Sequence, residues 1–138
     1  MLKISKLADY AIVILMKMMQ SPSKCYSASE VAELTGVALP TVRKLLKNLA
    51  ASGFMQSQRG SAGGYHLSLG VDLSVVDVIE AIDGPIALTE CALGDHDCKC
   101  GPNCDMDGYW PHINQVLRQS LASVTLVQLA RHQVGVPQ

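Results

Sequence analysis

Residues 27–53 read SASEVAELTGVALPTVRKLLKNLAASG, and this stretch contains the signals that decide the fold. Ser27 and Glu30 match the S-x-x-E capping box, in which each side chain bonds the backbone N–H of the other residue. The box predicts a helix over residues 28–35, and Gly36 is suited to end it. The side chains expected on its inner face are Val31, Ala32 and Leu34.

A second helix is predicted from Pro40 to about Ser52, after the tight connector VALP and before Gly53. Proline suits the first position of a helix because its missing N–H has no partner there. The side chains expected inside are Val42, Leu45, Leu46 and Leu49, and those expected outside are Thr41, Arg43, Lys44, Lys47 and Asn48. Two short helices joined by a turn, the second basic outside, are typical of a helix-turn-helix. An ordinary helical hairpin with a solvated basic face has the same pattern.

The next segment favours DNA binding over the plain hairpin. Residues 54–58 and 65–69 are predicted to form two strands, joined by the Gly-rich turn 59–64, and Tyr26 is a weaker candidate for a short pairing strand. Arg59 stands beside glycines that let a phosphate approach the backbone closely. A helix, a basic helix and then such a hairpin is the order of a winged helix-turn-helix. The predicted fold class is mainly α with a small β-hairpin wing.

Further helices are predicted on both sides of this unit. They are expected over residues 5–20, from Ser74 to Asp83, over 109–123, and after Thr125 in LVQLAR. The apolar stripe of the long helix comprises Ile113, Val116, Leu117, Leu121 and Val124. Because this helix exceeds what a winged domain needs for its core, we interpret it as a C-terminal dimerisation helix, with an intramolecular brace as the alternative.

These elements suggest three parts of the chain. We expect a DNA-binding domain over residues 1–84, a cysteine-rich loop over 85–108, and a dimerisation helix with a tail over 109–138. No apolar run reaches the roughly 18–20 residues that span a bilayer, and the first helix is interrupted by Asp9 and Lys17. A cytoplasmic protein with no membrane contact is therefore expected.

Charge divides the chain into two halves. Residues 1–70 carry eight Lys or Arg against three Asp or Glu, a net of +5, and residues 71–138 carry three against nine, a net of −6. A basic half indicates a polyanion-binding face on that half alone, although solvated charges also distribute by chance. No nucleophile–base pair, phosphate loop or paired acid constellation is found, so an enzyme is not expected.

Four of the five cysteines lie in the stretch CALGDHDCKCGPNC, residues 91–104, with the spacing C-x6-C-x-C-x3-C. Apart from Ala92 and Leu93, the residues between them are polar or Gly and Pro, so the loop has little apolar material to order it. A disulfide pair, a zinc ion or an iron–sulfur cluster would order it. In a cytosolic protein clustered cysteines are more often ligands or redox sensors than disulfides. Cys25 is expected to be a packed thiol.

Several segments together resemble the Rrf2 family of bacterial winged-helix regulators, which has IscR-like and NsrR-like members. They are MLKISKLADYA at the start, the helix-turn-helix, the wing RGSAGGYHL, the helix VVDVIEAIDGPI, and TEC…C…C…YW; GPIALTEC most resembles regulators of the SUF iron–sulfur assembly operon. The resemblance covers nearly the whole chain. It implies a homodimer that binds double-stranded promoter DNA, contacts its partner through the long helix and holds an iron–sulfur cluster.

The resemblance also implies a ligand set. Three cysteines ligate the cluster, and they match Cys91, Cys98 and Cys104. IscR-like members place a fourth ligand, His, at the position of Asp107, and NsrR-like members use an Asp at the position of Asp9, supplied by the partner. We favour Asp9. By residue count alone, Cys100 completes a four-thiolate set and is the next candidate, and the further ones are His96 and Asp107. Three cysteines and one oxygen ligand hold either a 2Fe–2S or a 4Fe–4S cluster.

For DNA, Thr41, Arg43 and Lys44 are expected near base edges, and Arg59 of the wing is expected in the minor groove. Arg43 should read guanine, because its fork matches two acceptors in the major groove, and Lys47 should contact phosphate. The residues expected at DNA are Ser29, Thr41, Arg43, Lys44, Lys47, Arg59 and Ser61. The expected function is an iron–sulfur-dependent transcriptional regulator, a repressor of SUF genes. The alternatives are a winged-helix regulator with structural zinc, and an iron–sulfur electron or cluster carrier, for which the basic half has no purpose.

Overall fold

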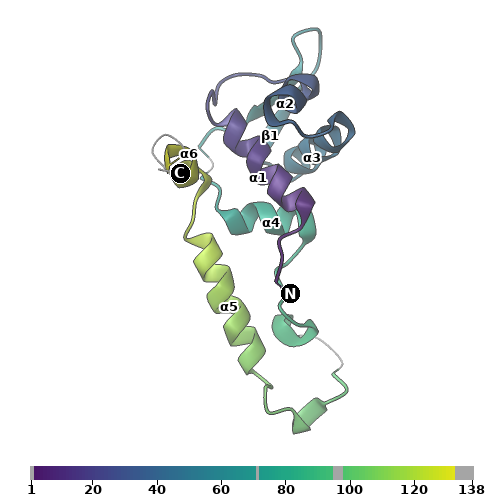
Figure 1. The fold of residues 1–138 in the computed structure, drawn as a ribbon, viewed down its shortest axis with the longest axis vertical. Coiled ribbons are helices and arrows are strands. Elements are labelled where there is room, and N and C mark those ends of the chain that lie inside the picture. Colours follow the sequence, from purple (N-terminus) through teal and green to yellow (C-terminus); the bar gives the residue numbers. More distant parts are fainter. Residues whose placement is uncertain (1, 71, 95–97, 133–138) are drawn as a thin grey trace.

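The computed structural model describes residues 2–70, 72–94 and 98–132, and its architecture is mainly helical with one small β-hairpin (Figure 1). The helices are α1 (Lys6–Met18), α2 (Ala28–Thr35), α3 (Leu39–Ala51), α4 (Val75–Asp83), α5 (Tyr109–Ala122) and α6 (Leu126–His132). The strands are β1 (Met55–Gln58) and β2 (Gly64–Leu67), and two 3-10 turns, η1 (Glu90–Leu93) and η2 (Gly101–Asn103), lie in the cysteine segment. The predicted fold class is confirmed.

The helix-turn-helix forms where its local signals predict it. Ser27 accepts a hydrogen bond from the Glu30 N–H, and the Glu30 side chain accepts one from the Ser27 N–H, so the capping box is complete. Gly36 ends α2 with a positive φ of 75°. The prediction for Leu34 was wrong. Val31 is 1% exposed but Leu34 is 48% exposed, because α2 is short and only the face centred on Val31 packs against α1 and α3.

The wing is a hairpin extended by one further backbone pairing. β1 and β2 are antiparallel, with Met55 opposite Leu67 and Gln58 opposite Gly64. Tyr26 pairs with Tyr65 on the other side of β2, where the Tyr26 N–H donates to the Tyr65 carbonyl at 2.8 Å and the Tyr65 N–H donates back at 2.7 Å. The segment that enters α2 is therefore joined to the wing, which confirms the short pairing strand predicted at Tyr26.

The core is organised around α1. This helix buries Ala8, Ala11, Ile14, Leu15 and Met18. Their faces meet α2, α3, α4 and α6, and the inner row of α3 is completely buried. That row is Val42, Leu45, Leu46 and Leu49, as predicted. None of the helices in the described ranges is long and apolar enough to cross a membrane.

The long helix α5 extends away from this core, and its C-terminal end is attached to it (Figure 1). Ser74 caps α4 in a second capping box with Asp77. The residues on either side of Ser74 form backbone hydrogen bonds to the α5–α6 connection. The Val75 N–H donates to the Val124 carbonyl at 2.9 Å, and the Leu126 N–H donates to the Leu73 carbonyl at 2.8 Å. Leu126 is then completely buried against the core.

The close approach of Tyr26 to β2 leads to a prediction. A Cβ at Gly64 would lie 2.7 Å from the Tyr26 carbonyl carbon, a backbone atom that cannot move aside. Gly64→Ala should therefore lower the free energy of unfolding by about 1–3 kcal/mol, the usual range for overpacking, and should weaken amide protection at Tyr26 and Tyr65. Urea unfolding and hydrogen exchange measure these effects. Ser57→Ala, at an exposed position of β1, is the control, and equal stability of the two variants would contradict the prediction.

Candidate DNA-binding face and cysteine loop

The outer face of α3 carries the basic residues predicted to contact DNA. Because the four apolar side chains of α3 face the core, Arg43, Lys44 and Lys47 are left exposed, while Thr41 is half-buried. Pro40 lies in the first turn, and Ala38 at the N-cap makes no side-chain cap bond. The N-terminal turns of α3 therefore present cations and open backbone N–H groups, which suits a helix that enters a major groove.

The wing and the start of α2 add exposed polar groups near this helix. Arg59 and Ser61 are exposed in the hairpin turn, and Ser29 is exposed in the first turn of α2. The turn is closed by the Gly63 N–H, which donates to the Gly60 carbonyl at 2.9 Å. The helix-turn-helix and the wing lie at one end of the molecule, and the cysteine loop lies at the other (Figure 1).

Three of the predicted ligands surround one small cavity. Cys91, Cys98 and Cys104 line a space of about 120 Å³, together with Asp107. Cys100 is not among the lining residues; it is exposed at the N-cap of η2, and repulsion from the nearby Cys98 raises the pKa of its thiol. None of the five cysteines, all of which lie in the described residues, forms a disulfide. The loop thus gathers three thiols of the type that binds iron or zinc, with a carboxylate beside them.

These groups do not form a closed metal site. Within the described residues, no three His, Cys, Asp or Glu side chains are arranged closely enough to hold a metal ion. His96 lies outside the described residues. Asp9 lies elsewhere in the chain: it is exposed on α1 and lines a larger groove of about 730 Å³ with Ser5, Asp83 and Ile79. Within one chain, therefore, Asp107 lies at the cysteine cavity and Asp9 does not.

The base of the loop is held by a buried amide that the sequence did not predict. Asn114 on α5 is only 5% exposed, although its sequence neighbours Ile113 and Gln115 are exposed. Its Nδ2 donates to the Ile86 carbonyl at 2.8 Å, and its Oδ1 accepts from the Leu88 N–H at 3.0 Å. A polar residue inside the apolar periodicity of α5 was the available signal, but its partners are more than 25 residues away in sequence.

An ion pair lies one turn further along α5. Arg118 donates to both oxygens of Glu80 on α4, from Nε and Nη2, at 2.7 Å each. The hydrogen bonds from Arg118 lower the pKa of the Glu80 carboxyl, and the same bonds raise the pKa of Arg118. Glu80 Oε1 also accepts from the Ile86 N–H at 3.4 Å. Glu80 thus contacts both α5 and the start of the loop.

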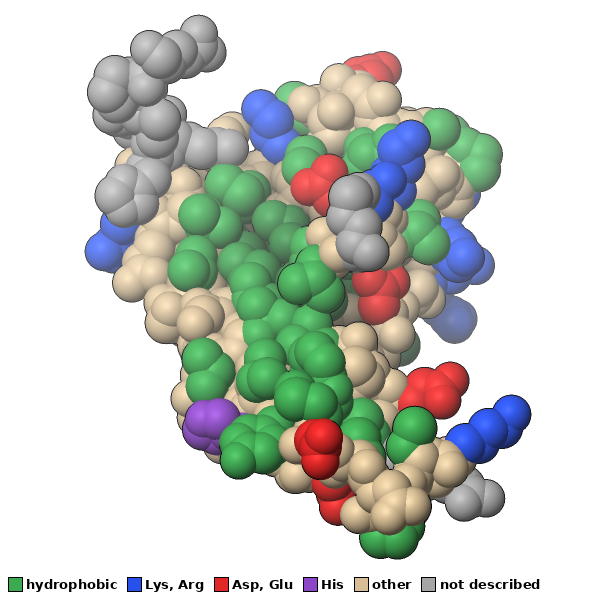
Figure 2. All heavy atoms as spheres, turned by 60° about the horizontal axis from the view of Figure 1, so that its bottom comes forward, with side chains coloured by type: hydrophobic (Ala, Val, Ile, Leu, Met, Phe, Trp, Pro, Cys, Tyr) green, Lys and Arg blue, Asp and Glu red, His purple; other side chains and the backbone are tan. Residues whose placement is uncertain are grey.

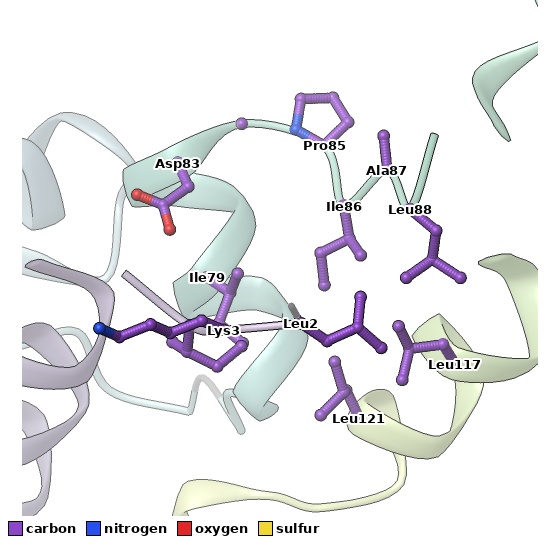
Figure 3. Close-up of a pocket in the computed structure, with 12 residues that line it drawn as sticks. Leu2, Lys3, Ile79, Asp83, Pro85, Ile86, Ala87, Leu88, Leu117 and Leu121 are labelled. Carbon is purple, nitrogen blue, oxygen red and sulfur yellow. The ribbon is translucent and has the colours of Figure 1, made fainter. Parts of the chain in front are cut away.

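An apolar face remains exposed along α5. Tyr109, Ile113 and Val116 are exposed, with Ile113 at 39% and Val116 at 50%. Beside them, a cavity of about 330 Å³ lies between α4, α5 and the N-terminal residues (Figure 3), and Leu2, Ile79, Ile86, Leu88, Leu117 and Leu121 line it. Figure 2 shows hydrophobic side chains in one continuous band on this side of the molecule. The predicted stripe of α5 is therefore divided: Leu117 and Leu121 are half-buried, and Ile113 and Val116 face solvent.

Comparison with known proteins agrees with this architecture. The family model Rrf2, described as an iron-dependent transcriptional regulator, matches residues 4–132. The transcriptional regulator IscR of Vibrio atlanticus is 26% identical over 94% of this chain and 76% of its own length, and IscR of Xenorhabdus nematophila is 28% identical over 76% and 64%. The solved structure of CymR, the global cysteine regulator of B. subtilis, is 26% identical, with a TM-score of 0.74 over 96% of this chain and 98% of CymR.

The Glu80–Arg118 pair predicts a pH-dependent contribution to stability. Because Arg118 lowers the folded-state pKa of Glu80, the pair stabilises the fold fully at neutral pH, and this contribution is lost as the pH falls through that pKa. Arg118→Gln should lower the free energy of unfolding near neutral pH only slightly, because the pair is partly solvated. In acid, where Glu80 is protonated, the difference should disappear.

Urea unfolding at one fixed chain concentration measures both values. Arg131→Gln, which removes the same charge from an exposed position on α6, is the control. A difference between wild type and Arg118→Gln that is the same at neutral and acid pH would mean that the pair contributes nothing through the Glu80 charge.

Proposed function

The chain belongs to the Rrf2 family of transcriptional regulators, and on that premise we propose that it is a homodimeric repressor of iron–sulfur assembly (SUF) genes whose promoter binding depends on an iron–sulfur cluster. The family and the relatives are regulators of transcription, not enzymes, so DNA binding is its activity. The observation that carries the cluster proposal is the gathering of Cys91, Cys98 and Cys104 around one cavity.

The cysteine cavity suits a cluster by its chemistry. Iron–sulfur clusters are held by thiolates, and a bound cluster supplies a centre that responds to iron supply and oxidation. We propose Cys91, Cys98 and Cys104 as three ligands and Asp9 of the partner chain as the fourth. The separation of Asp9 from the cysteines within one chain is what ligation across a dimer requires. Cys100 and Asp107 are the alternatives from the same chain, and Asp107 has the support of lining the cavity.

The exposed apolar face of α5 supports the dimer. A soluble monomer rarely exposes a continuous apolar band, and such a band marks an interaction surface. Ile113 and Val116 provide it on α5, and Leu2 and Ile4 continue it from the N-terminal residues. In a twofold dimer the two helix-turn-helix units would be related by the same axis, so that the two halves of a palindromic operator are read by identical α3 helices.

Two alternatives assign the cysteines differently. Zinc accepts four thiolates readily, and Cys100 is near enough to Cys98 to shift in pKa because of it. A structural zinc site in a regulator that does not sense iron is therefore the second candidate. The third candidate is an electron or cluster carrier. The exposed cations of α3 and the wing disfavour it, because a carrier does not need a face that binds a polyanion.

The cluster is tested by purifying the protein without oxygen and measuring iron, sulfide, zinc and visible absorption. We expect iron and sulfide in equal amounts and a coloured protein. Cys91→Ser, Cys98→Ser and Cys104→Ser should each lose at least about 90% of the iron, because each removes a thiolate. Cys25→Ser, in the connection between α1 and α2, is the matched control and should retain the iron. A colourless, zinc-loaded protein would reject the cluster proposal.

The fourth ligand is tested by Asp9→Ala, Cys100→Ser and Asp107→Ala in the same measurement. We expect Asp9→Ala alone to change the absorption spectrum or the lability of the cluster. Mixing Asp9→Ala chains with Cys91→Ser chains separates the two geometries. Only ligation across the dimer allows the mixture to form one site from the intact Asp9 of one chain and the intact cysteines of the other. A mixture in which the wild-type absorption spectrum does not reappear would reject ligation by the partner.

DNA reading is tested by Arg43→Ala and Lys47→Ala. Arg43→Ala should relax base preference, by about 1–3 kcal/mol of discrimination at one position of each half-site. Lys47→Ala should weaken binding to all sequences and reduce the salt slope by about 1. Electrophoretic retardation with the native promoter, point-substituted operators and a salt series measures both. Arg131→Ala on α6 is the control. The reverse pattern would mean that the two residues exchange roles.

A further inference from the structure

We infer that Asn114 is a positioning residue that fixes Cys91, and that Asn114, Ile86, Glu80 and Arg118 link the cysteine loop to the DNA-binding half. This inference rests on the proposed function, because it concerns how that site is built and how its state reaches α4. The observation that carries it is that the backbone of Ile86 is held from two helices: α5 holds its carbonyl through Asn114, and α4 holds its N–H through Glu80.

The first step is the fit of the amide. Asn114 is one of two buried polar side chains among the described residues, and both ends of its amide are used. An amide supplies one donor end and one acceptor end, which match the Ile86 carbonyl and the Leu88 N–H. A buried polar group that loses its partner has a large energetic cost. Asn114 therefore determines where residues 86–88 lie against α5.

The second step is the apolar side of the same segment. Ile86 and Leu88 point into the cavity between α4 and α5, where Leu117 and Leu121 of α5 and Ile79 of α4 lie opposite them (Figure 3). The segment is thus held by hydrogen bonds on its backbone and by apolar contacts through its side chains. A segment anchored in both ways transmits a displacement rather than absorbing it.

The third step leads from this segment to the first cysteine. Thr89 follows Leu88, and its Oγ1 lies 3.1 Å from Cys91 Sγ within hydrogen-bonding distance. The Ala92 N–H donates to the Thr89 carbonyl at 3.1 Å, and Ala92 is buried. Cys98 and Cys100, by contrast, are exposed. Cys91 is therefore the ligand that this anchored segment positions.

The fourth step leads from Ile86 to the DNA-binding half. Glu80, which accepts from the Ile86 N–H, also accepts from Nε and Nη2 of Arg118, one helical turn after Asn114 on α5. Glu80 belongs to α4, and α4 packs against α1 and α3. A shift of the cysteine loop would therefore change the position of α4 against α1 and α3, and with it the orientation of α3.

The positioning role is tested first in metal-free protein with Asn114→Ala. We expect the Leu88 amide to exchange about tenfold faster, because its acceptor is lost. We also expect alkylation of Cys91 to rise at least about threefold relative to Cys25 in the same chain. Gln115→Ala, at the adjacent exposed position of α5, is the matched control, and Leu126→Val lowers stability in the core at a distance from the loop. Both controls should leave Leu88 and Cys91 unchanged.

The link is tested by the ratio of promoter affinities of cluster-loaded and metal-free protein at one salt concentration. Asn114→Ala should reduce this ratio at least about threefold. Arg118→Gln opens the other half of the link, so it should also reduce the ratio while the Leu88 amide stays protected. If the wild-type protein binds the promoter equally well with and without the cluster, the proposed cluster control fails. The metal-free measurements still decide whether Asn114 positions Cys91. The inference would be overturned if Asn114→Ala showed the same affinity ratio as wild type and the same rate of Cys91 alkylation.

Discussion

The burial of one face of α1 is the constraint on which the structure depends. Ala8, Ala11, Ile14, Leu15 and Met18 have almost no solvent exposure, and α2, α3, α4 and α6 all pack against that helix. Because packed interiors transmit strain rather than deform freely, these helices hold fixed relative orientations. The angle at which α3 presents its cations to DNA is consequently determined by residues that never meet DNA. The pairing of Tyr26 with Tyr65 extends the same constraint from the core to the wing.

The helix α5 is held differently, and this difference matters for function. Its C-terminal end is joined to α4 by backbone bonds on either side of Ser74, and its middle is joined by the Glu80–Arg118 pair. Its N-terminal end carries the cysteine loop away from the core (Figure 1). Within one chain, a change at the cysteines therefore has two routes to the DNA-binding half, α5 itself and residues 84–88. Asn114 lies where these two routes meet.

How much of the fold and of the candidate site the sequence predicts depends on how far apart in the chain the interacting residues are. Both capping boxes, Pro40 and Gly36 act within four residues, so the helices were predicted almost to the residue. Leu34 was misplaced because helical period alone does not say how wide the covered face is. Asn114 and the Glu80–Arg118 pair join residues 26 to 38 positions apart, and no local pattern marks such partners. The cysteine spacing indicated a site, but η1 and η2 decide which thiols turn toward the cavity.

The arrangement of the ligands bears on why a dimer would be needed at all. Asp9 lies in a groove with Asp83 beside α4, and the cysteine cavity lies beyond the far end of α5. A site assembled from one chain would use Asp107 or Cys100 and would leave α1 uninvolved. A site completed by the partner's Asp9 would attach the loop of one chain to the helix on which the other chain's core is built. Loss of the cluster would then act on α1, the element that orients α3, rather than on a surface loop. Ligation across the dimer is for this reason the geometry that most directly makes DNA affinity depend on the cluster.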